Sequence, residues 1–264
     1  MHPIERLRWI ARDRDEAPTT LAVEAAWAIS DLVADEPAAV VTACRRLVEA
    51  HVTVGPLWWV AATVLAAPDP QQAARHMVAE LVSDPTAELL AAGLGDRLDA
   101  DAPIVVGCPA ETVVEAFLHR PVATVRVVGS SPGLRGQVRR FATTAAYADG
   151  FECDEAQQAV RGAAVVLVEA IAADSRGVLV TAAAVPLAEA AQGAHVPLWG
   201  VAGVGRVLQD RLLEEVLRRA GDGVQLIDAA SFDLVAGPAG LEAPARALAR
   251  GVCPPAPELL VHAR

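Results

Sequence analysis

The hydrophobic pattern of this 264-residue chain changes once, near residue 98, and that change constrains the fold most strongly. Before it, apolar residues recur at the 3.6-residue period of an amphipathic helix, for example at Ile4, Leu7 and Ile10. Prolines divide this part into segments of helical length, and they stand at Pro18, Pro37, Pro56, Pro68 and Pro85. The pattern predicts an N-terminal helical domain over residues 1–97, with roughly four or five helices.

After this point, short runs of β-branched and apolar residues alternate with segments of helical length. The predicted strands are Ile104–Gly107, Val125–Val128, Phe151–Cys153, Val165–Val168, Leu198–Ala202 and Gln225–Ile227. The predicted helices are Glu111–Leu118, Leu134–Ala148, Ala182–Ala191 and Val207–Ala220. Repeated strand–helix–strand units need crossover connections, so the sheet should be mostly parallel and covered on both faces. Residues 98–264 are therefore predicted to form a Rossmann-like α/β domain.

The composition favours the same α/β class. Hydrophobic residues make up 53% of the chain but aromatic residues only 4%, so the core must be built from Ala, Val and Leu. Small aliphatic residues suit buried parallel strands covered by alanine-rich helices. A β-sandwich is correspondingly disfavoured.

Charge and residue usage exclude several classes of function. The formal net charge is -11, which argues against a broad nucleic-acid or anionic-membrane surface, because phosphate binding needs clustered cations. The chain contains no lysine, which excludes a lysine Schiff-base mechanism. The longest apolar stretch, residues 52–67, contains Gly55 and Pro56 and is too short to span a bilayer. We therefore expect a cytoplasmic protein with no nucleic-acid or membrane partner.

The cysteines and histidines show no metal-ligand pattern. The four cysteines lie far apart without CxxC pairing and are expected to be reduced thiols; they are Cys44, Cys108, Cys153 and Cys253. The six histidines show no HExxH or other ligand spacing. We predict neither a metal nor a cofactor.

Three segments that follow predicted strands carry candidate chemistry, because ligands of open parallel sheets gather at the carboxyl ends of the strands. The first is Gly107-Cys108-Pro109. It places the Cys108 thiol at the start of a helix, where the positive end of the helix dipole lowers a thiol pKa. The alternative is that Cys108 is a small buried hydrophobic residue.

The second segment is the turn over residues 129–137, which reads GSSPGLRGQ. Its backbone N–H groups and side chains could hold a phosphate, and the residues concerned are Ser130, Ser131, Arg135, Gly136 and Gln137. The glycine spacings of dinucleotide-binding and P-loop motifs are absent, so the turn does not indicate a nucleotide. An ordinary turn with a helix cap is the alternative.

The third segment ends at Glu169, whose carboxylate directly follows four apolar strand residues. A carboxylate in this position could be partly desolvated and poised for proton transfer. A glutamate in a surface loop is the alternative reading.

The order of elements resembles the family that contains the alpha, beta and delta subunits of translation initiation factor 2B, methylthioribose-1-phosphate isomerase and ribose-1,5-bisphosphate isomerase. The resemblance covers nearly the whole chain. It rests on the segments HVTVGPLWWVAATVL, VVGCPAETVVEAF, VRVVGSSPGLRGQ and VLVEAIAADSRGVLVTAAAVPLAEAA. The last of these is the most specific, because it is similar to the family's GAD stretch and the alanine-rich helix that follows.

This resemblance implies an acid/base pair and a phosphate site. In the family's isomerases, a cysteine after the first sheet strand and an aspartate in the GAD stretch are the proposed proton-transfer groups, and they match Cys108 and Glu169. The family's RP pair in the helical part falls on His51 and Val52, which makes His51 a candidate ligand-binding residue. Gly107, which precedes Cys108, is a further candidate. Several phosphate-binding positions of the family differ here; the ETRP turn, for example, reads GSSP.

Two functions follow as hypotheses. One is a divergent family member that binds a small phosphorylated or sugar-like metabolite and isomerises an aldose phosphate to a ketose phosphate. The other is a non-catalytic protein that keeps the fold for assembly or regulation. The resemblance also implies a homodimer, and the use of arginine without lysine suggests a bacterial genome rich in G and C.

Overall fold

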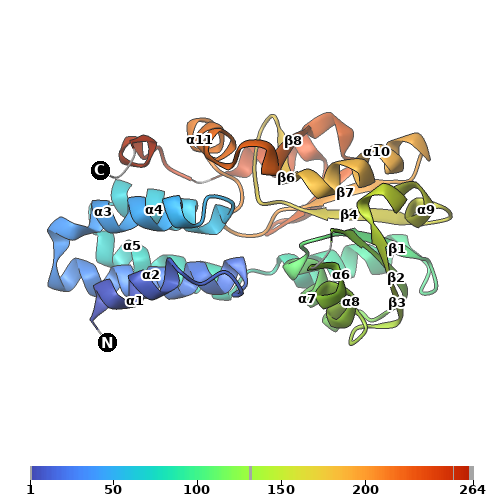
Figure 1. Ribbon diagram of the computed structural model, residues 1–264, viewed down its shortest axis with the longest axis horizontal. Helices are drawn as coiled ribbons and strands as arrows, with labels where there is room; N and C mark the ends of the chain where they lie inside the picture. Colours follow the sequence, from blue (N-terminus) through green and yellow to red (C-terminus); the bar gives the residue numbers. More distant parts are fainter. Residues whose placement is uncertain (1, 131–132, 252, 262–264) are drawn as a thin grey trace. The chain divides into compact units, whose positions relative to one another are not determined.

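The computed structural model describes residues 2–130, 133–251 and 253–261, apart from the side chains at positions 133 and 135. The chain forms two compact units, each built from more than one segment (Figure 1). Unit 1 comprises residues 1–84, 204–221 and 251–264, and unit 2 comprises residues 85–203 and 222–250. This grouping differs from the predicted division at residue 97. The helix over 86–97 packs with the sheet, and two later segments pack with the N-terminal helices.

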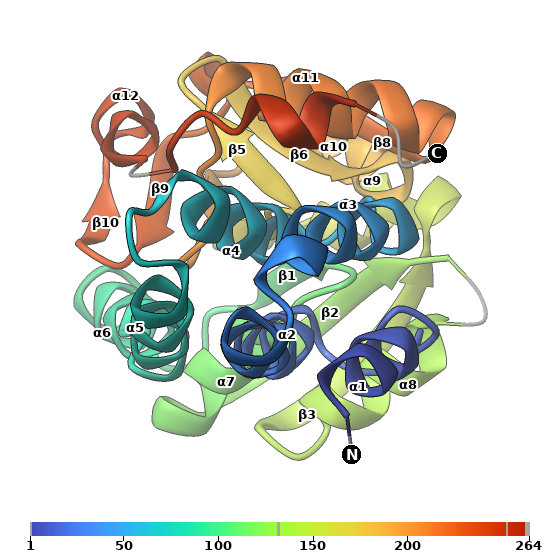
Figure 2. The same ribbon diagram turned by 90° about the vertical axis from the view of Figure 1, so that its left-hand side faces the viewer.

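Unit 1 is helical. Its helices are α1 (Pro3–Ile10), α2 (Pro18–Asp35), α3 (Val40–Ala50), α4 (Gly55–Ala66), α5 (Pro70–Val82) and α11 (Asp210–Ala220), with short 3-10 turns η1 (Pro37–Ala39) and η7 (Pro257–Leu260). Figure 2 looks along several of these helices. Ala22, Ala25, Ala26 and Ala28 of α2 are fully buried, which allows this helix to pack closely against α4 and α5.

Helix α4 lies in the interior of unit 1. It is apolar on all sides, as expected for a helix that is buried on all sides. Trp58 is fully buried, and its indole N–H donates a hydrogen bond of 3.0 Å to the carbonyl of Val52. The guanidinium carbon of Arg219 lies 5.1 Å from the centre of the same ring. A large aromatic side chain with a satisfied polar group thus anchors this core.

Unit 2 is built on a seven-stranded sheet in the order β10-β9-β7-β4-β1-β2-β3. The strands are β1 (Ile104–Gly107), β2 (Val122–Gly129), β3 (Ala145–Glu152), β4 (Val165–Glu169), β7 (Leu198–Val201), β9 (Leu234–Gly237) and β10 (Gly240–Glu242). All neighbouring pairs are parallel except β9 and β10. The predicted α/β class and the mostly parallel sheet are confirmed.

Helices cover both faces of this sheet (Figure 1). On one face lie α6 (Thr86–Arg97), α7 (Glu111–His119) and α8 (Gly133–Phe141), and on the other lie α9 (Ala156–Val160) and α10 (Val185–Gly193). In the core between the sheet and α6–α8, strands β1, β2 and β4 contribute mainly valines, and the helices contribute alanines, leucines and two phenylalanines. Strand β1 is buried along its whole length, which the continuous apolar sequence IVVG requires.

A second, three-stranded antiparallel sheet completes unit 2. It contains β5 (Ala172–Asp174), β6 (Gly177–Thr181) and β8 (Val224–Asp228), and the short helix α12 (Pro244–Ala247) follows later in the chain. The strand predicted at Gln225–Ile227 is therefore present but pairs with β6, outside the parallel sheet. Strand pairing depends on contacts between distant segments, which a local apolar pattern does not specify.

The edge strand β3 differs most from its prediction. The helix predicted over Leu134–Ala148 ends at Phe141, and the strand predicted at Phe151–Cys153 begins at Ala145. The first half of β3 is rich in alanine, a helix former, but it pairs with β2 in parallel register. Tertiary pairing here overrides local propensity.

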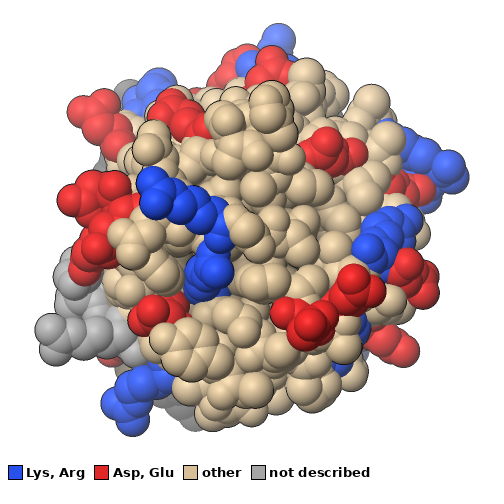
Figure 3. Space-filling model, turned by 90° about the vertical axis from the view of Figure 1, so that its right-hand side faces the viewer, with Lys and Arg blue, Asp and Glu red and all other residues tan. Residues whose placement is uncertain are grey.

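No helix in the described part of the chain is both long enough and apolar enough to cross a membrane. On the molecular face drawn in Figure 3, uncharged side chains predominate, and the blue basic groups are small and lie among red acidic groups. This face therefore carries no continuous basic patch.

Candidate functional site

The predicted site residues Cys108, Ser130 and Glu169 lie at one edge of the seven-stranded sheet. Cys108 directly follows β1, Ser130 directly follows β2, and Glu169 is the last residue of β4. Strand β1 lies between β2 and β4, and all three run in the same direction. Chain order reverses between β1 and β4, which is the position where open α/β sheets form a ligand crevice.

Glu169 is buried and its carboxylate binds the first turn of α7. Oε2 accepts hydrogen bonds from the backbone N–H groups of Thr112 at 2.8 Å and Val113 at 3.4 Å, and Oε1 accepts one from the Thr112 hydroxyl at 3.1 Å. Ala110 is the N-cap residue of α7, and its methyl side chain cannot accept hydrogen bonds from these N–H groups. Glu169 therefore caps the helix, and its negative charge faces the positive end of the helix dipole.

Cys108 is half-buried and shortly precedes α7, the helix that Glu169 caps. Its backbone N–H donates to the Val128 carbonyl at 2.9 Å, and its carbonyl accepts from the Thr181 hydroxyl at 3.3 Å. A side chain at Gly129 would place its Cβ 3.4 Å from the Cys108 Sγ, so a glycine leaves room for the thiol. The peptide bond between Cys108 and Pro109 is cis.

Burial raises the pKa of Cys108 to about 12, and the neighbouring Cys153 adds to the increase. The sequence predicts the opposite shift, from the positive end of the helix that follows Cys108. The Glu169 carboxylate already occupies that helix end, so the dipole is offset and desolvation decides the pKa. Cys108 is a protonated thiol near neutral pH.

Cys153 is a member of this site that the sequence analysis did not single out. It directly follows β3 and is close enough to Cys108 to influence its pKa, and its own thiol is hydrogen bonded to the Ser130 side chain. Burial and then the acidic neighbours Glu152 and Asp154 raise the pKa of Cys153. Its position at the end of the predicted strand Phe151–Cys153 was the available signal.

The turn between β2 and α8 is described only in part. Ser131 lies outside the described residues, and the side chain of Arg135 is not described. Ser130 and Gly136 are exposed, whereas the side-chain oxygen of Gln137 is buried and has no hydrogen-bond partner among the residues described. A phosphate site at this turn stays a prediction.

The two remaining predicted residues have structural contacts. A Cβ at Gly107 would lie 3.2 Å from the side chain of Leu187, so this glycine permits close helix packing. His51 belongs to unit 1, where its Nε2 donates to the Ile10 carbonyl at 2.7 Å and lies 3.4 Å from Nη1 of Arg14. Burial is the main reason why the pKa of His51 is lowered. A role in ligand binding is untested for both residues.

Within the described ranges, no group of three or more His, Cys, Asp or Glu side chains could hold a metal ion. The side chains assembled at the sheet edge include two thiols, hydroxyls and the Glu169 carboxylate that caps α7.

No protein-family model matches the sequence, and a search of curated proteins gives no match. Solved structures do match. Translation initiation factor eIF-2B from Pyrococcus horikoshii OT3 superimposes with a TM-score of 0.71 at 17% identity, covering 93% of this chain and 98% of that chain. The chain has the initiation factor 2B fold.

Two other structures with the initiation factor 2B fold are similarly close. The tetrameric eIF2B-beta2-delta2 complex from C. thermophilum gives a TM-score of 0.70 at 16% identity and covers 92% of this chain and 91% of that chain. The 5-methylthioribose 1-phosphate isomerase from Pyrococcus horikoshii OT3 gives 0.62 at 14% identity, with coverage of 93% and 86%. The initiation factor 2B fold thus includes an enzyme and subunits of a translation factor, and the fold does not choose between them.

Proposed function

We propose that this chain binds a small phosphorylated metabolite, such as a sugar phosphate, at the carboxyl edge of its seven-stranded sheet and does not isomerise it. The observation that carries the second half of this proposal is the position of Glu169. Its carboxylate is buried and holds the first turn of α7, and both of its oxygens accept hydrogen bonds from Thr112.

The proposed binding is supported by the position of the β2–α8 turn. The turn follows a parallel strand beside the point where chain order reverses, and it leads into a helix of nine residues. Backbone N–H groups at such a helix start, together with the exposed Ser130 hydroxyl, are suitable donors for a phosphate. The predicted contributions of Ser131, Arg135, Gly136 and Gln137 belong to this proposal.

The absence of isomerisation follows from the chemistry that the reaction needs. Conversion of an aldose to a ketose requires a base that removes a proton from the carbon next to the carbonyl, and an acid that protonates the oxygen. Catalytic groups work best when their pKa lies near the working pH. Glu169 is engaged by the protein itself, and the pKa of Cys108 is about 12, far above neutrality.

A second candidate function is aldose–ketose phosphate isomerisation with Cys108 as proton donor and Glu169 as base. One observation favours it: the two residues stand at the ends of the adjacent strands β1 and β4. In that case a bound substrate would have to draw the Glu169 carboxylate away from α7 before proton transfer.

We further propose that the protein acts as a cytoplasmic homodimer in a bacterial cell. The support for assembly is the tetrameric complex among the similar structures. Size-exclusion chromatography with light scattering tests this part separately, since a monomer over the micromolar range would contradict it.

Thermal denaturation with a panel of sugar phosphates and nucleoside monophosphates tests the binding. At a ligand concentration of a hundred times Kd, the melting temperature should rise by roughly 5–10 °C. Ser130→Ala should reduce the shift. Thr143→Ala is the matched control, because this exposed hydroxyl lies just beyond the other end of α8 and binds the Arg140 carbonyl. If no phosphorylated compound raises the melting temperature, the binding proposal fails.

Isotope exchange tests the absence of catalysis. A sugar phosphate that binds is incubated with the protein in deuterium oxide, and its proton next to the carbonyl is followed by NMR. We expect no exchange above the rate without protein. Exchange that is lost in both Cys108→Ser and Glu169→Gln would instead establish the isomerase.

A further inference from the structure

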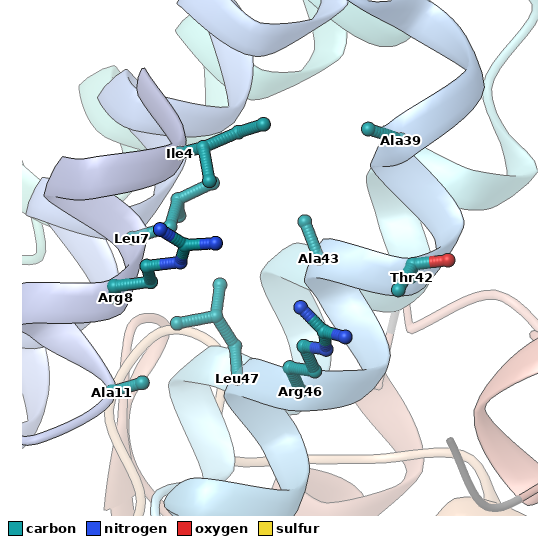
Figure 4. Close-up of a pocket in the computed structure, with 9 residues that line it drawn as sticks. All are labelled: Ile4, Leu7, Arg8, Ala11, Ala39, Thr42, Ala43, Arg46 and Leu47. Atoms are coloured by element: carbon teal, nitrogen blue, oxygen red, sulfur yellow. The ribbon is translucent and has the colours of Figure 1, made fainter. Parts of the chain in front are cut away.

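A groove separates α1 from α3 in unit 1, and all of its lining residues belong to that unit (Figure 4). Its volume is about 120 Å³. The groove is lined by consecutive turns of both helices, and its apolar walls include the buried side chains of Leu7 and Leu47 and the half-buried side chain of Ile4. Residues three and four apart share one face of a helix, so each helix presents a continuous stripe to the groove.

Small residues keep the groove open. Ala11 on the α1 side and Ala39 and Ala43 on the α3 side occupy positions where larger aliphatic side chains would meet across the gap. All three are half-buried, so part of each residue that lines the groove is exposed to solvent. A void of this kind loses the dispersion contacts that close packing provides, which makes filling it with an apolar group favourable.

Two arginines flank the gap. The side chains of Arg8 and Arg46 extend toward it from opposite helices (Figure 4). Arg8 Nη1 binds Glu5 Oε1 at 2.5 Å, but both side chains are 58% exposed, so solvent screens this pair. No acidic side chain pairs with Arg46 in the parts of the chain that the structure describes.

These two guanidinium groups favour an anion locally. The chain as a whole carries a formal net charge of -11, which repels anions at long range. Guanidinium groups bind carboxylates through paired N–H donors, and two of them beside an apolar cavity match a ligand with a charged head and a hydrophobic body. A cavity of about 150 Å³ accepts a benzene ring, so the body should be about one ring or a short alkyl chain.

We propose that the α1–α3 groove binds a small organic carboxylate, with its aromatic or aliphatic body between Leu7 and Leu47 and its carboxylate between Arg8 and Arg46. This site is independent of the function proposed for the sheet edge. It assigns a ligand class to unit 1 that neither the fold nor the sheet-edge residues imply.

Ligand-observed NMR and calorimetry on the full chain, at low ionic strength, test the proposal with four probes. Benzoate and phenylacetate carry both the body and the charge, benzyl alcohol carries the body alone, and acetate carries the charge alone. We expect saturable binding of the two aromatic carboxylates and at least roughly tenfold weaker binding of the other two.

Variants then place the binding in the groove. Arg46→Gln should weaken benzoate binding by roughly three- to tenfold. Arg12→Gln is the matched control, because Arg12 is an exposed arginine just beyond α1 that does not line the groove. Ala43→Leu should fill the groove and abolish binding, and an unchanged or higher melting temperature would show that this variant is folded.

Three results would overturn the site. They are equal affinity for benzoate and benzyl alcohol, equal weakening by Arg46→Gln and Arg12→Gln, and undiminished binding in a folded Ala43→Leu variant. Absence of saturable binding of benzoate and phenylacetate at millimolar concentration would overturn it as well. If Ala43→Leu changes only the oligomeric state, the groove is a contact between copies and the proposal fails.

Discussion

The carboxyl edge of the sheet and the α1–α3 groove differ in how their charged groups are used. At the sheet edge, the Glu169 carboxylate is buried and already satisfied by donors of the same chain. In the groove, Arg46 is exposed, and in the parts that the structure describes no acidic side chain pairs with it. The charged group at the sheet edge is therefore engaged by the protein itself, whereas Arg46 in the groove can pair with a ligand. Availability of a group matters as much as its identity.

The reactivity of Cys108 gives the largest expected effect. With a pKa of about 12, its thiolate fraction at pH 7 is far below that of free cysteine. Alkylation by iodoacetamide should then be slower than for free cysteine by roughly a thousandfold. Peptide mapping after timed alkylation separates Cys108 from the other cysteines. A rate near that of free cysteine would reopen the sheet edge as a reactive site.

Removal of the Glu169 carboxylate should give the next largest effect. Glu169→Ala leaves buried N–H groups of Thr112 and Val113 and the Thr112 hydroxyl without this acceptor, which should cost about 2–4 kcal/mol of unfolding free energy. Glu169→Gln, which keeps one oxygen acceptor, should lose less. Thermal and urea denaturation measure both variants. Equal stability of wild type and Glu169→Ala would mean that the carboxylate is not holding α7.

Removal of an exposed helix cap should have a smaller effect on stability, and it provides a reference for the buried cap at Glu169. Asp69 caps α5 by accepting a hydrogen bond of 3.0 Å from the Gln72 N–H, at an exposed position. Asp69→Ala should cost about 1 kcal/mol, because water can replace the lost acceptor. The same denaturation series measures it. If Asp69→Ala loses as much unfolding free energy as Glu169→Ala, burial does not explain the cost of removing the Glu169 carboxylate.

The pH dependence of Glu215 is expected to be smallest. Hydrogen bonding to Arg218 is the main reason why the pKa of Glu215 lies below its ordinary value of 4.5. A lowered pKa in the folded state contributes stability above the unfolded value and loses it as pH falls through the folded value. The melting temperature should therefore fall below about pH 4.5, by the equivalent of about 0.5–1 kcal/mol for this group.

Glu215→Gln isolates this contribution. The variant cannot lose it on acidification, so its acid slope should be shallower than that of the wild type. Identical acid slopes in the two proteins would contradict the assignment to Glu215.

The local sequence pattern was sufficient to predict the bounds of elements whose conformation does not depend on neighbouring strands. Strand β1 begins and ends where the run IVVG predicts, and β4 extends one residue beyond its prediction to include Glu169. Asp69 followed by proline is a helix start that local chemistry specifies, and α5 begins there. Strand β3 was mispredicted because its alanines favour a helix until β2 is beside it.

The hydrogen-bond partners of the site side chains were less predictable from the sequence than the strands on which they lie. Glu169 and Thr112 are far apart in the sequence and meet only because β4 pairs with β1 and α7 follows β1. Ala110 gave a hint, since an N-cap without a polar side chain leaves N–H groups that need another acceptor. The α1–α3 groove depends on which faces of two helices approach each other, and helical periodicity does not determine that.

Amide hydrogen exchange at the first turn of α7 tests the central claim most directly. Thr112 and Val113 have N–H groups bound to Glu169, whereas the N–H of Val114 donates to the Ala110 carbonyl within the helix. We predict that all three amides are protected in the wild type and that Glu169→Ala removes protection from Thr112 and Val113 while Val114 stays protected. Rapid exchange of Thr112 and Val113 in the wild type would show that the carboxylate is free, and would contradict the account.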